Sequence, residues 1–122
     1  MKTNQYEALT FSNELPEVEE YCQLRIDGGM SPRSHKMAKH SLERSLFLLA
    51  VRCRTTHELV GLGRVIGDYT SMQVVDIVVH PSFRGQKIAR KIMIEVMHFI
   101  KCHGDETSFI CLLYTSPSPR DV

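Results

Sequence analysis

The pattern of apolar and polar positions changes along the chain, and each change predicts a different kind of element. Residues 6–11 favour a short first strand. The apolar residues that follow recur at helical spacing, and Ser12 or Asn13 is the expected N-cap of that helix, because either side chain can accept a hydrogen bond from its first amides. The glycine pair at 28–29 ends the helix. A second, weakly amphipathic helix is expected over residues 31–45.

Between residues 46 and 79 the apolar positions do not follow a helical period. Residues 46–54, 59–67 and 72–79 form largely apolar stretches without a clear polar face, which is typical of strands buried inside a sheet. Asp76 is the one charged residue in the last of these stretches. Polar residues between the stretches favour tight turns. The pattern therefore predicts adjacent antiparallel strands connected as a meander.

A period of 3.6 residues begins at Gln86 and continues to Lys101. The apolar row of this stretch consists of Ile88, Ile92, Val96 and Ile100. It predicts a long amphipathic helix that packs on the sheet and stops near Gly104. Residues 107–110 then begin a further strand.

Composition and charge exclude several classes of function. A chain of 122 residues suggests one domain, and 43% hydrophobic residues are enough for a core. The formal net charge of +1 gives no basic surface for nucleic acid or an anionic membrane. No apolar run approaches the roughly 20 residues that span a bilayer, and the first residues lack the apolar centre of a signal peptide. A cytoplasmic protein is expected.

The spacing of cysteines and histidines predicts no metal site. The 4 cysteines include no CxxC pair, and the 6 histidines include no HExxH pair. Scattered cysteines of this kind are usually small apolar residues of the core.

The segment 76–93 carries the most chemical information. A buried strand ends at His80 and Pro81, and a short loop containing Arg84 and Gly85 leads directly into the long helix. A helix N-terminus presents unpaired amides and a partial positive charge, a glycine lets the backbone approach a ligand, and an arginine adds a charged contact. These features predict an anion site. The alternative is an ordinary strand–loop–helix unit with no ligand.

Residues 79–89, with the sequence VHPSFRGQKIA, resemble motif A of the GNAT superfamily of N-acetyltransferases. Its signature is Arg or Gln, two residues, Gly, one residue, and Gly or Ala. Arg84 and Ala89 match this signature, whereas Lys87 stands where the family has Gly. The segments YCQLRIDGGMSP, LFLLAVR, LVGLGRVIGD and QVVDIVVHP also resemble the superfamily in its order, so that the resemblance covers roughly residues 6–110.

The resemblance implies an α+β fold, with a mixed, mostly antiparallel sheet flanked by helices and splayed open after the strand that ends at Val79. Acetyl-CoA is then expected in the opening as the co-substrate. The backbone of Ile77, Val78 and Val79 is expected to pair with its pantetheine arm. The amides of the following loop and helix are expected to hold its pyrophosphate. These residues are Arg84, Gly85, Gln86, Lys87, Ile88 and Ala89.

The activity implied by the resemblance is direct transfer of an acetyl group to an amine of a small molecule or a peptide, without a covalent enzyme intermediate. Direct transfer needs a neutral amine, so a base or a water path must accept its proton. Asp76 is the candidate base, and His80 is a second candidate. Two alternatives remain for Asp76: it holds the substrate ammonium, or it is a buried aspartate satisfied by backbone donors. Arg33, His35 and Lys36 are expected on the surface near the acceptor site.

A different class of function is a non-catalytic acyl-CoA-binding or interaction module that has kept the fold, which Lys87 makes a reasonable alternative. The sequence predicts neither the acceptor amine nor the oligomeric state.

The end of the chain departs from the family pattern. Residues 111–121, CLLYTSPSPRD, correspond residue for residue to one reading frame of a common transposase-based sequencing adapter. We therefore expect an incomplete N-acetyltransferase domain over residues 1–110 and a non-native tail over 111–122, so that the C-terminal strands and helix of the fold are missing. A chain that lacks them is expected to fold poorly and to have little or no activity, whereas its untruncated parent is expected to be an enzyme.

Overall fold

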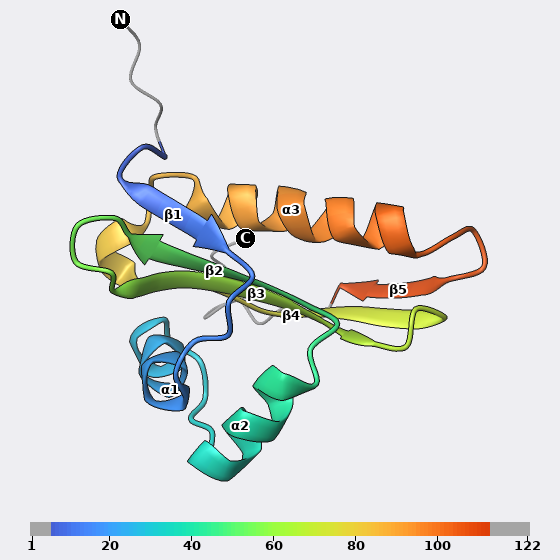
Figure 1. Cartoon of the computed structure of the whole chain (residues 1–122), viewed down its shortest axis with the longest axis horizontal. Coiled ribbons are helices and arrows are strands. Elements are labelled where there is room, and N and C mark those ends of the chain that lie inside the picture. The colour runs from blue at the N-terminus through green and yellow to red at the C-terminus, as the bar shows by residue number, and fades with distance from the viewer. Residues whose placement is uncertain (1–5, 113–122) are drawn as a thin grey trace, which may run out of the picture.

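The computed structural model describes residues 6–112, shown in colour in Figure 1. In chain order the elements are β1 (Leu9–Ser12), α1 (Val18–Asp27), α2 (His35–Glu43), β2 (Phe47–Cys53), β3 (Leu59–Gly67), β4 (Ser71–Val79), the 3₁₀ helix η1 (Pro81–Phe83), α3 (Ile88–His103) and β5 (Phe109–Leu112). Over these residues no helix combines the length and the apolar character that a membrane crossing requires.

The strands form one sheet in the order β1-β2-β3-β4-β5. Neighbours from β1 to β4 are antiparallel, whereas β5 runs parallel to β4. A parallel pair needs a long crossover connection, and α3 provides it. The helix α3 covers one face of the sheet, and α1 and α2 lie together on the other (Figure 1). The α+β class and the meander predicted from the sequence are confirmed.

Each face of the sheet has its own core. On the α3 face, the predicted helical row packs against apolar residues of the strands. The members from α3 are Ile88, Ile92, Val96 and Ile100, and those from the strands include Leu49, Val51, Val60, Val65, Met72, Val74 and Val79. On the other face, the core contains Tyr21, Cys22, Leu24, Ala38, Leu42, Leu48, Ala50, Leu59, Leu62 and Val78.

The prediction for the start of α1 was wrong. Ser12 is the last residue of β1, and the side chain of Asn13 donates to the carbonyl oxygen of Leu48 at 2.8 Å, so both residues belong to the edge of the sheet. The helix begins after Glu17, whose amide donates to the carboxylate of Glu20 at 2.8 Å. Glu17, in a capping box with Glu20, is thus the N-cap in place of Ser12 or Asn13.

Other bounds shift by a few residues. The helix α2 begins at His35, because the hydroxyl of Ser34 accepts a hydrogen bond from the amide of Met37 at 3.2 Å. The helix α3 begins at Ile88 rather than at residue 86, because Lys87 has a left-handed backbone. Of the segment proposed as a non-native tail, residues 111 and 112 belong to β5 and residues 113–122 lie outside the described part.

The strand β4 contains a bulge at Asp76. Its register with β3 shifts between Leu62 and Arg64, and Asp76 has a left-handed φ of 57°. An extra residue reverses the alternation of side chains between the two faces of a sheet. Residues on both sides of the bulge therefore contact the core under α3, namely Met72 and Val74 before it and Ile77 and Val79 after it.

Candidate active site

The junction between β4 and α3 is built from a short, tightly turned segment. After Val79, residues 81–83 form η1, and the Nδ1 atom of His80 accepts a hydrogen bond from the amide of Ser82 at 3.1 Å. Proline at the first position of η1 ends the strand, because it has no amide to donate to a sheet. The segment thus reverses the chain between the end of β4 and the start of α3.

Two left-handed residues shape the loop that follows. Gly85 has φ 85° and Lys87 has φ 59°. The left-handed region costs a non-glycine residue about 1–2 kcal/mol, which explains why the GNAT signature has Gly at the position of Lys87. Around Gly85 there is open space, since no atom lies within 4 Å of the position that a Cβ would occupy. A ligand can therefore reach the backbone here.

The start of α3 presents a run of amides. The first amides of an α-helix have no partner within the helix, and they carry its partial positive charge. Residues 84–87, 89 and 90 are exposed, and only Ile88 among its neighbours is buried. The carbonyl oxygen of Lys87 accepts hydrogen bonds from the amide of Lys91 at 3.1 Å and from the hydroxyl of Tyr6 at 3.0 Å. The loop is thereby held in place. The amide of Arg84, which was expected to contact the pyrophosphate, instead donates to the carbonyl oxygen of Pro81 at 3.3 Å.

Arg84 lies between the loop and the end of α1. Its Nη2 atom donates to the carbonyl oxygen of Gly28 at 3.1 Å. Gly28 in turn lies against β4, where a Cβ atom would come within 2.3 Å of a methyl group of Val78. Because a guanidinium has five N–H donors, Arg84 keeps further donors for a ligand.

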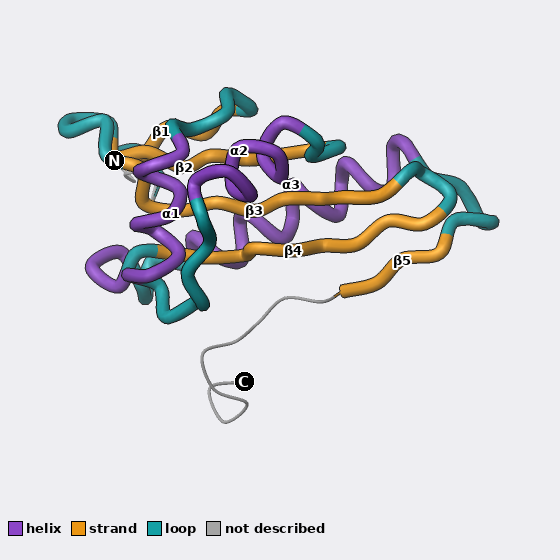
Figure 2. The backbone as a smooth tube through the Cα atoms, turned by 90° about the horizontal axis from the view of Figure 1, so that it is seen from below, coloured by secondary structure: helices purple, strands orange, loops and turns teal. Residues whose placement is uncertain are grey.

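The second half of β4 has an open edge. The strand β5 pairs with β4 only from Ser71, opposite Phe109, to Val74, opposite Leu112 (Figure 2). Beyond Val74, no other strand in the described residues pairs with this side of β4. On the opposite side the ladder with β3 continues, and the amide of His80 donates to Val60 at 2.7 Å.

Along this ladder, residues that are hydrogen-bonded to β3 alternate with residues that are not, and this alternation shows which peptide groups face the open edge of β4. Because His80 is hydrogen-bonded to β3, and Gly61 lies opposite Val79, the peptide groups of Val79 point away from β3. The peptide groups of Val78 face β3, so they are not available at the open edge. The carbonyl oxygen of Ile77, on the opposite side of the same trans peptide as the Val78 amide, is directed to the open edge.

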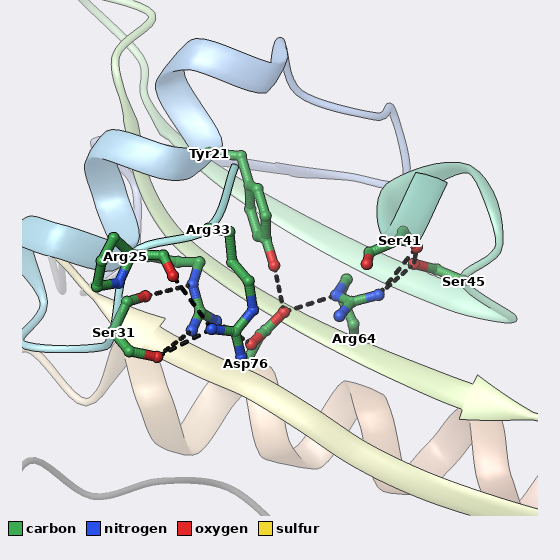
Figure 3. A network of polar contacts seen from close by, with 9 residues as sticks. Tyr21, Arg25, Ser31, Arg33, Ser41, Ser45, Arg64 and Asp76 are labelled. Carbon is green, nitrogen blue, oxygen red and sulfur yellow. Dashed lines mark hydrogen bonds and ion pairs between the residues drawn. The ribbon is translucent and has the colours of Figure 1, made fainter. Parts of the chain in front are cut away.

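Asp76, the predicted base, lies in a buried network (Figure 3). Its Oδ1 accepts from Arg25 Nη1 at 2.5 Å. Its Oδ2 accepts from the hydroxyl of Tyr21 at 2.5 Å and from Arg64 Nε at 2.7 Å. The residue is 7% exposed. The carboxylate is therefore satisfied by side chains of α1 and β3, not by the backbone donors that the sequence analysis considered as an alternative.

The surroundings of Asp76 shift two pKa values. Burial by itself would raise the pKa of Asp76, but the guanidinium of Arg64, the Tyr21 hydroxyl and Arg25 outweigh it, and the pKa is lowered. Burial, together with the negative charge of Asp76, raises the pKa of Tyr21 to about 12. Asp76 is therefore ionised and Tyr21 is neutral at physiological pH. A carboxylate whose pKa is moved further below neutrality is poorly suited to act as a general base there.

The remaining candidates lie nearer the surface. The Nε2 atom of His80 lies 3.7 Å from a carboxylate oxygen of Asp27, at the end of α1. Arg33, His35 and Lys36 are exposed, and the Arg33 guanidinium donates to the hydroxyl of Ser31 at 2.9 Å. In the described part of the chain, no three His, Cys, Asp or Glu side chains come together as a metal site would require.

Several residues that build this site were not singled out from the sequence. They are Tyr6, Tyr21, Arg25, Gly28 and Arg64. Arg64 had a visible signal, because it is a lone charge in an otherwise apolar stretch, as is Asp76, whereas Arg25 stands among other charged and polar residues. Charges in such positions are buried only when they are paired.

Comparison with known proteins identifies the family. The sequence matches the model of the acetyltransferase (GNAT) family over residues 10–118. A similar solved structure is that of a protein of unknown function from methicillin-resistant Staphylococcus aureus, described as a probable acetyltransferase. It is 35% identical, the match covers 92% of this chain and 84% of that chain, and the TM-score is 0.84. A GNAT family acetyltransferase from Streptococcus pneumoniae is 23% identical, with 93% and 80% covered and a TM-score of 0.71, and shows the same fold. No curated protein matches the sequence. The residues, the fold and these matches agree that the chain belongs to the acetyltransferase (GNAT) family.

Proposed function

We propose that the chain binds acetyl-CoA where β4 meets α3, and that it acts as an N-acetyltransferase on an amine of a small molecule or a peptide. The observation that carries this proposal is the loop at residues 84–87. Its two left-handed residues lead into the first amides of α3, next to the open edge of β4.

The diphosphate part of acetyl-CoA matches the loop. Diphosphates bind to outward-facing amides at helix N-termini, where the partial positive charge of the helix adds to the hydrogen bonds. The side chains of Arg84, Lys87 and Arg90 are exposed around these amides and supply formal positive charge. Open space at Gly85 allows the ligand to approach.

The pantetheine part matches the edge of β4. Its amides can pair with an unpaired strand edge in the way an added strand does. The carbonyl oxygen of Ile77 and the peptide groups of Val79 support this proposal, because the ladder with β3 leaves them on this edge. When bound, acetyl-CoA supplies a thioester as the acetyl donor, and the strand edge and the loop together hold it in a defined direction.

The acceptor amine has to lose a proton when it is acetylated. Asp76 is an unsuitable acceptor for that proton, because both carboxylate oxygens already receive hydrogen bonds from buried donors. His80 is also unsuitable in its present contacts, because its Nδ1 atom accepts from Ser82. We therefore propose that the proton passes to water.

A charge reversal in the loop tests the binding site. The substitution Lys87→Glu places a negative charge beside the proposed diphosphate, and we expect it to weaken binding of coenzyme A by roughly tenfold, equivalent to about 1–2 kcal/mol. The matched control is Lys101→Glu in the last turn of the same helix, where the affinity should stay unchanged. Isothermal titration calorimetry measures both. Absence of coenzyme A binding to the unsubstituted chain, or equal effects of the two variants, contradicts the proposed site.

Thiol release separates an enzyme from a binding module. Acetyl-CoA is added with a panel of amines, and release of the coenzyme A thiol reports transfer. Lys87 stands where the family signature has Gly, and this difference favours one alternative, a module that binds acyl-CoA without turnover. Binding without thiol release across the panel, also in a longer version of the chain that includes the family's C-terminal strands and helix, would support that alternative against the enzyme.

A further inference from the structure

The carboxylate of Asp76 connects the sheet with the whole helical layer on one face. Through Tyr21 and Arg25 it holds α1. Arg25 also donates to the carbonyl oxygen of Ser31 at 3.1 Å, in the loop between α1 and α2. On the other side, Arg64 donates at 3.0 Å to the carbonyl oxygen of Ser41, in α2. Figure 3 shows this chain of contacts running from one helix to the other across Asp76.

The charges of this network depend on Asp76. Arg25 is 2% exposed and Arg64 is 7% exposed, so two guanidiniums are buried beside a single carboxylate. Buried cations repel each other strongly unless an anion lies between them. In the described residues, all buried side-chain nitrogen and oxygen atoms have hydrogen-bond partners. Asp76 is therefore the group that allows Arg25 and Arg64 to occupy the same interior.

The same residue shapes the strand that leads to the proposed acetyl-CoA site. Asp76 has the left-handed backbone of the β4 bulge, and Ile77 follows it directly. Aspartate tolerates this conformation better than most residues, but it still needs surroundings that hold it there. The ion pairs and the Tyr21 hydroxyl provide such surroundings from two elements at once.

We propose that Asp76 is a positioning residue for acetyl-CoA, which it does not touch. By holding the bulge, it sets the direction in which the carbonyl oxygen of Ile77 and the peptide groups of Val79 meet the pantetheine arm. By holding α1, it also places Gly28 against β4 and within reach of Arg84. This inference rests on the proposed function, because it names what aligns the strand edge of that site.

The substitution Asp76→Asn tests the inference. Asparagine has nearly the same shape and also tolerates the left-handed backbone, but it carries no charge. We expect the dissociation constant of coenzyme A to rise roughly tenfold, as for loss of a charge-assisted hydrogen bond, with kcat at saturating acetyl-CoA nearly unchanged. The shape of the pH–rate profile should stay that of the unsubstituted protein. The opposite result overturns the proposal: unchanged coenzyme A affinity with kcat reduced by about a hundredfold or more and loss of the acidic limb, as for removal of a general base.

A milder variant covers the case in which Asp76→Asn does not fold. Tyr21→Phe removes one hydroxyl from the network and leaves both ion pairs. We expect coenzyme A to bind about threefold to tenfold more weakly, the equivalent of one hydrogen bond. The matched control is Tyr69→Phe in the exposed turn before β4, which should leave the affinity unchanged. Equal affinities in all of these proteins contradict the positioning role.

Hydrogen exchange gives a readout that needs no ligand. The amide of His80 donates across the ladder to Val60, four residues after the bulge at Asp76. We expect its exchange to accelerate in Tyr21→Phe and to stay unchanged in Tyr69→Phe, because only the former loosens the bulge. Failure of the unsubstituted chain to bind coenzyme A would refute the proposed function alone, whereas unchanged exchange in Tyr21→Phe would refute the role of the network.

Discussion

The two faces of the sheet are filled by different kinds of interaction. Under α3 the buried side chains are apolar, and they come from a single long helix and the strands. Under α1 and α2, apolar residues surround Arg25, Arg64 and Asp76, which are charged and almost completely buried. The first face is stabilised by burial of apolar surface, which has no preferred direction. The second also depends on hydrogen bonds that work only in one geometry.

Because of this difference, the two faces contribute differently to the stability of the fold and to the alignment of β4. An apolar core accepts small shifts of its members, because most orientations bury a similar area. A carboxylate between two guanidiniums accepts little movement, since a lost contact leaves a buried charge unpaired. The face with the network is therefore the better place from which to fix the geometry of β4, and the next four substitutions test that division.

The largest effect is expected from removing the anion of the network. Asp76→Ala leaves Arg25 and Arg64 buried without a counter-charge, and we expect the free energy of unfolding to fall by about 3–5 kcal/mol in urea denaturation. Adding Arg25→Met to the same chain removes one of the two cations and should restore part of the loss. A loss below about 1 kcal/mol would mean that the network contributes no more than an ordinary surface group.

On the apolar face, Ile92→Ala is expected to cost about 3 kcal/mol, because it removes methyl groups from a side chain that is fully buried. The substitution changes no titratable group, so the loss in free energy of unfolding should be the same at acidic, neutral and alkaline pH. The control on the same helix is Ile94→Ala, whose side chain is 53% exposed and which should change stability by less than about 0.5 kcal/mol. A loss of stability in Ile92→Ala that varied with pH would show that the apolar face and the charged network on the other face are energetically coupled.

The network, in contrast, should make stability depend on pH. The pKa of Asp76 is lowered in the folded protein, so its contribution is present above the unfolded-state pKa near 4 and is lost as the pH falls below it. The pKa of Tyr21 is raised from 10.0 to about 12, so its contribution is present below pH 10 and is lost between pH 10 and 12. Tyr21→Phe should cost about 1 kcal/mol at neutral pH and abolish the alkaline part of the loss.

Urea midpoints measured across the pH range check this prediction. The variant Tyr69→Phe serves as the control and should keep the alkaline loss. An unchanged alkaline loss in Tyr21→Phe would assign it to another group.

The smallest effect is expected from an ion pair on the same face that is not buried. Arg52 donates to both carboxylate oxygens of Glu20, and the two side chains are 24% and 29% exposed. We expect Arg52→Gln to lower the midpoint of thermal unfolding only slightly, by the equivalent of about 0.5 kcal/mol. A loss as large as that of Asp76→Ala would show that burial is not what distinguishes the network.

Periodicity predicted the fold where one helix or strand had a clear apolar pattern. The row from Ile88 to Ile100 predicted α3 and the face it covers, and the apolar stretches predicted the central strands. The start of α1 was missed, because Ser12 and Asn13 are good caps by residue type and the actual N-cap is Glu17, paired with Glu20. Local preference alone does not decide between two such partners.

The bulge at Asp76 left no trace in the hydrophobic pattern. Residues 72–79 are apolar on both faces, so a change of phase within them does not alter the order of apolar and polar positions. The prediction could place Asp76 in a buried strand, but its partners come from α1 and β3, at sequence distances that no local pattern reports. The family signature in the loop was easier to recognise, because Arg84, Gly85 and Ala89 lie within six consecutive positions.

The hydrogen bond from Tyr6 to the carbonyl oxygen of Lys87 has a practical consequence for the way this protein is produced. A purification tag or fusion partner close to the N-terminus that displaced the phenol would disturb a loop more than eighty positions away along the chain. Preparations that differ only in their N-terminal tag would then differ in ligand affinity. Proteins tagged at the N-terminus and at the C-terminus should therefore be compared before a dissociation constant is attributed to the loop itself.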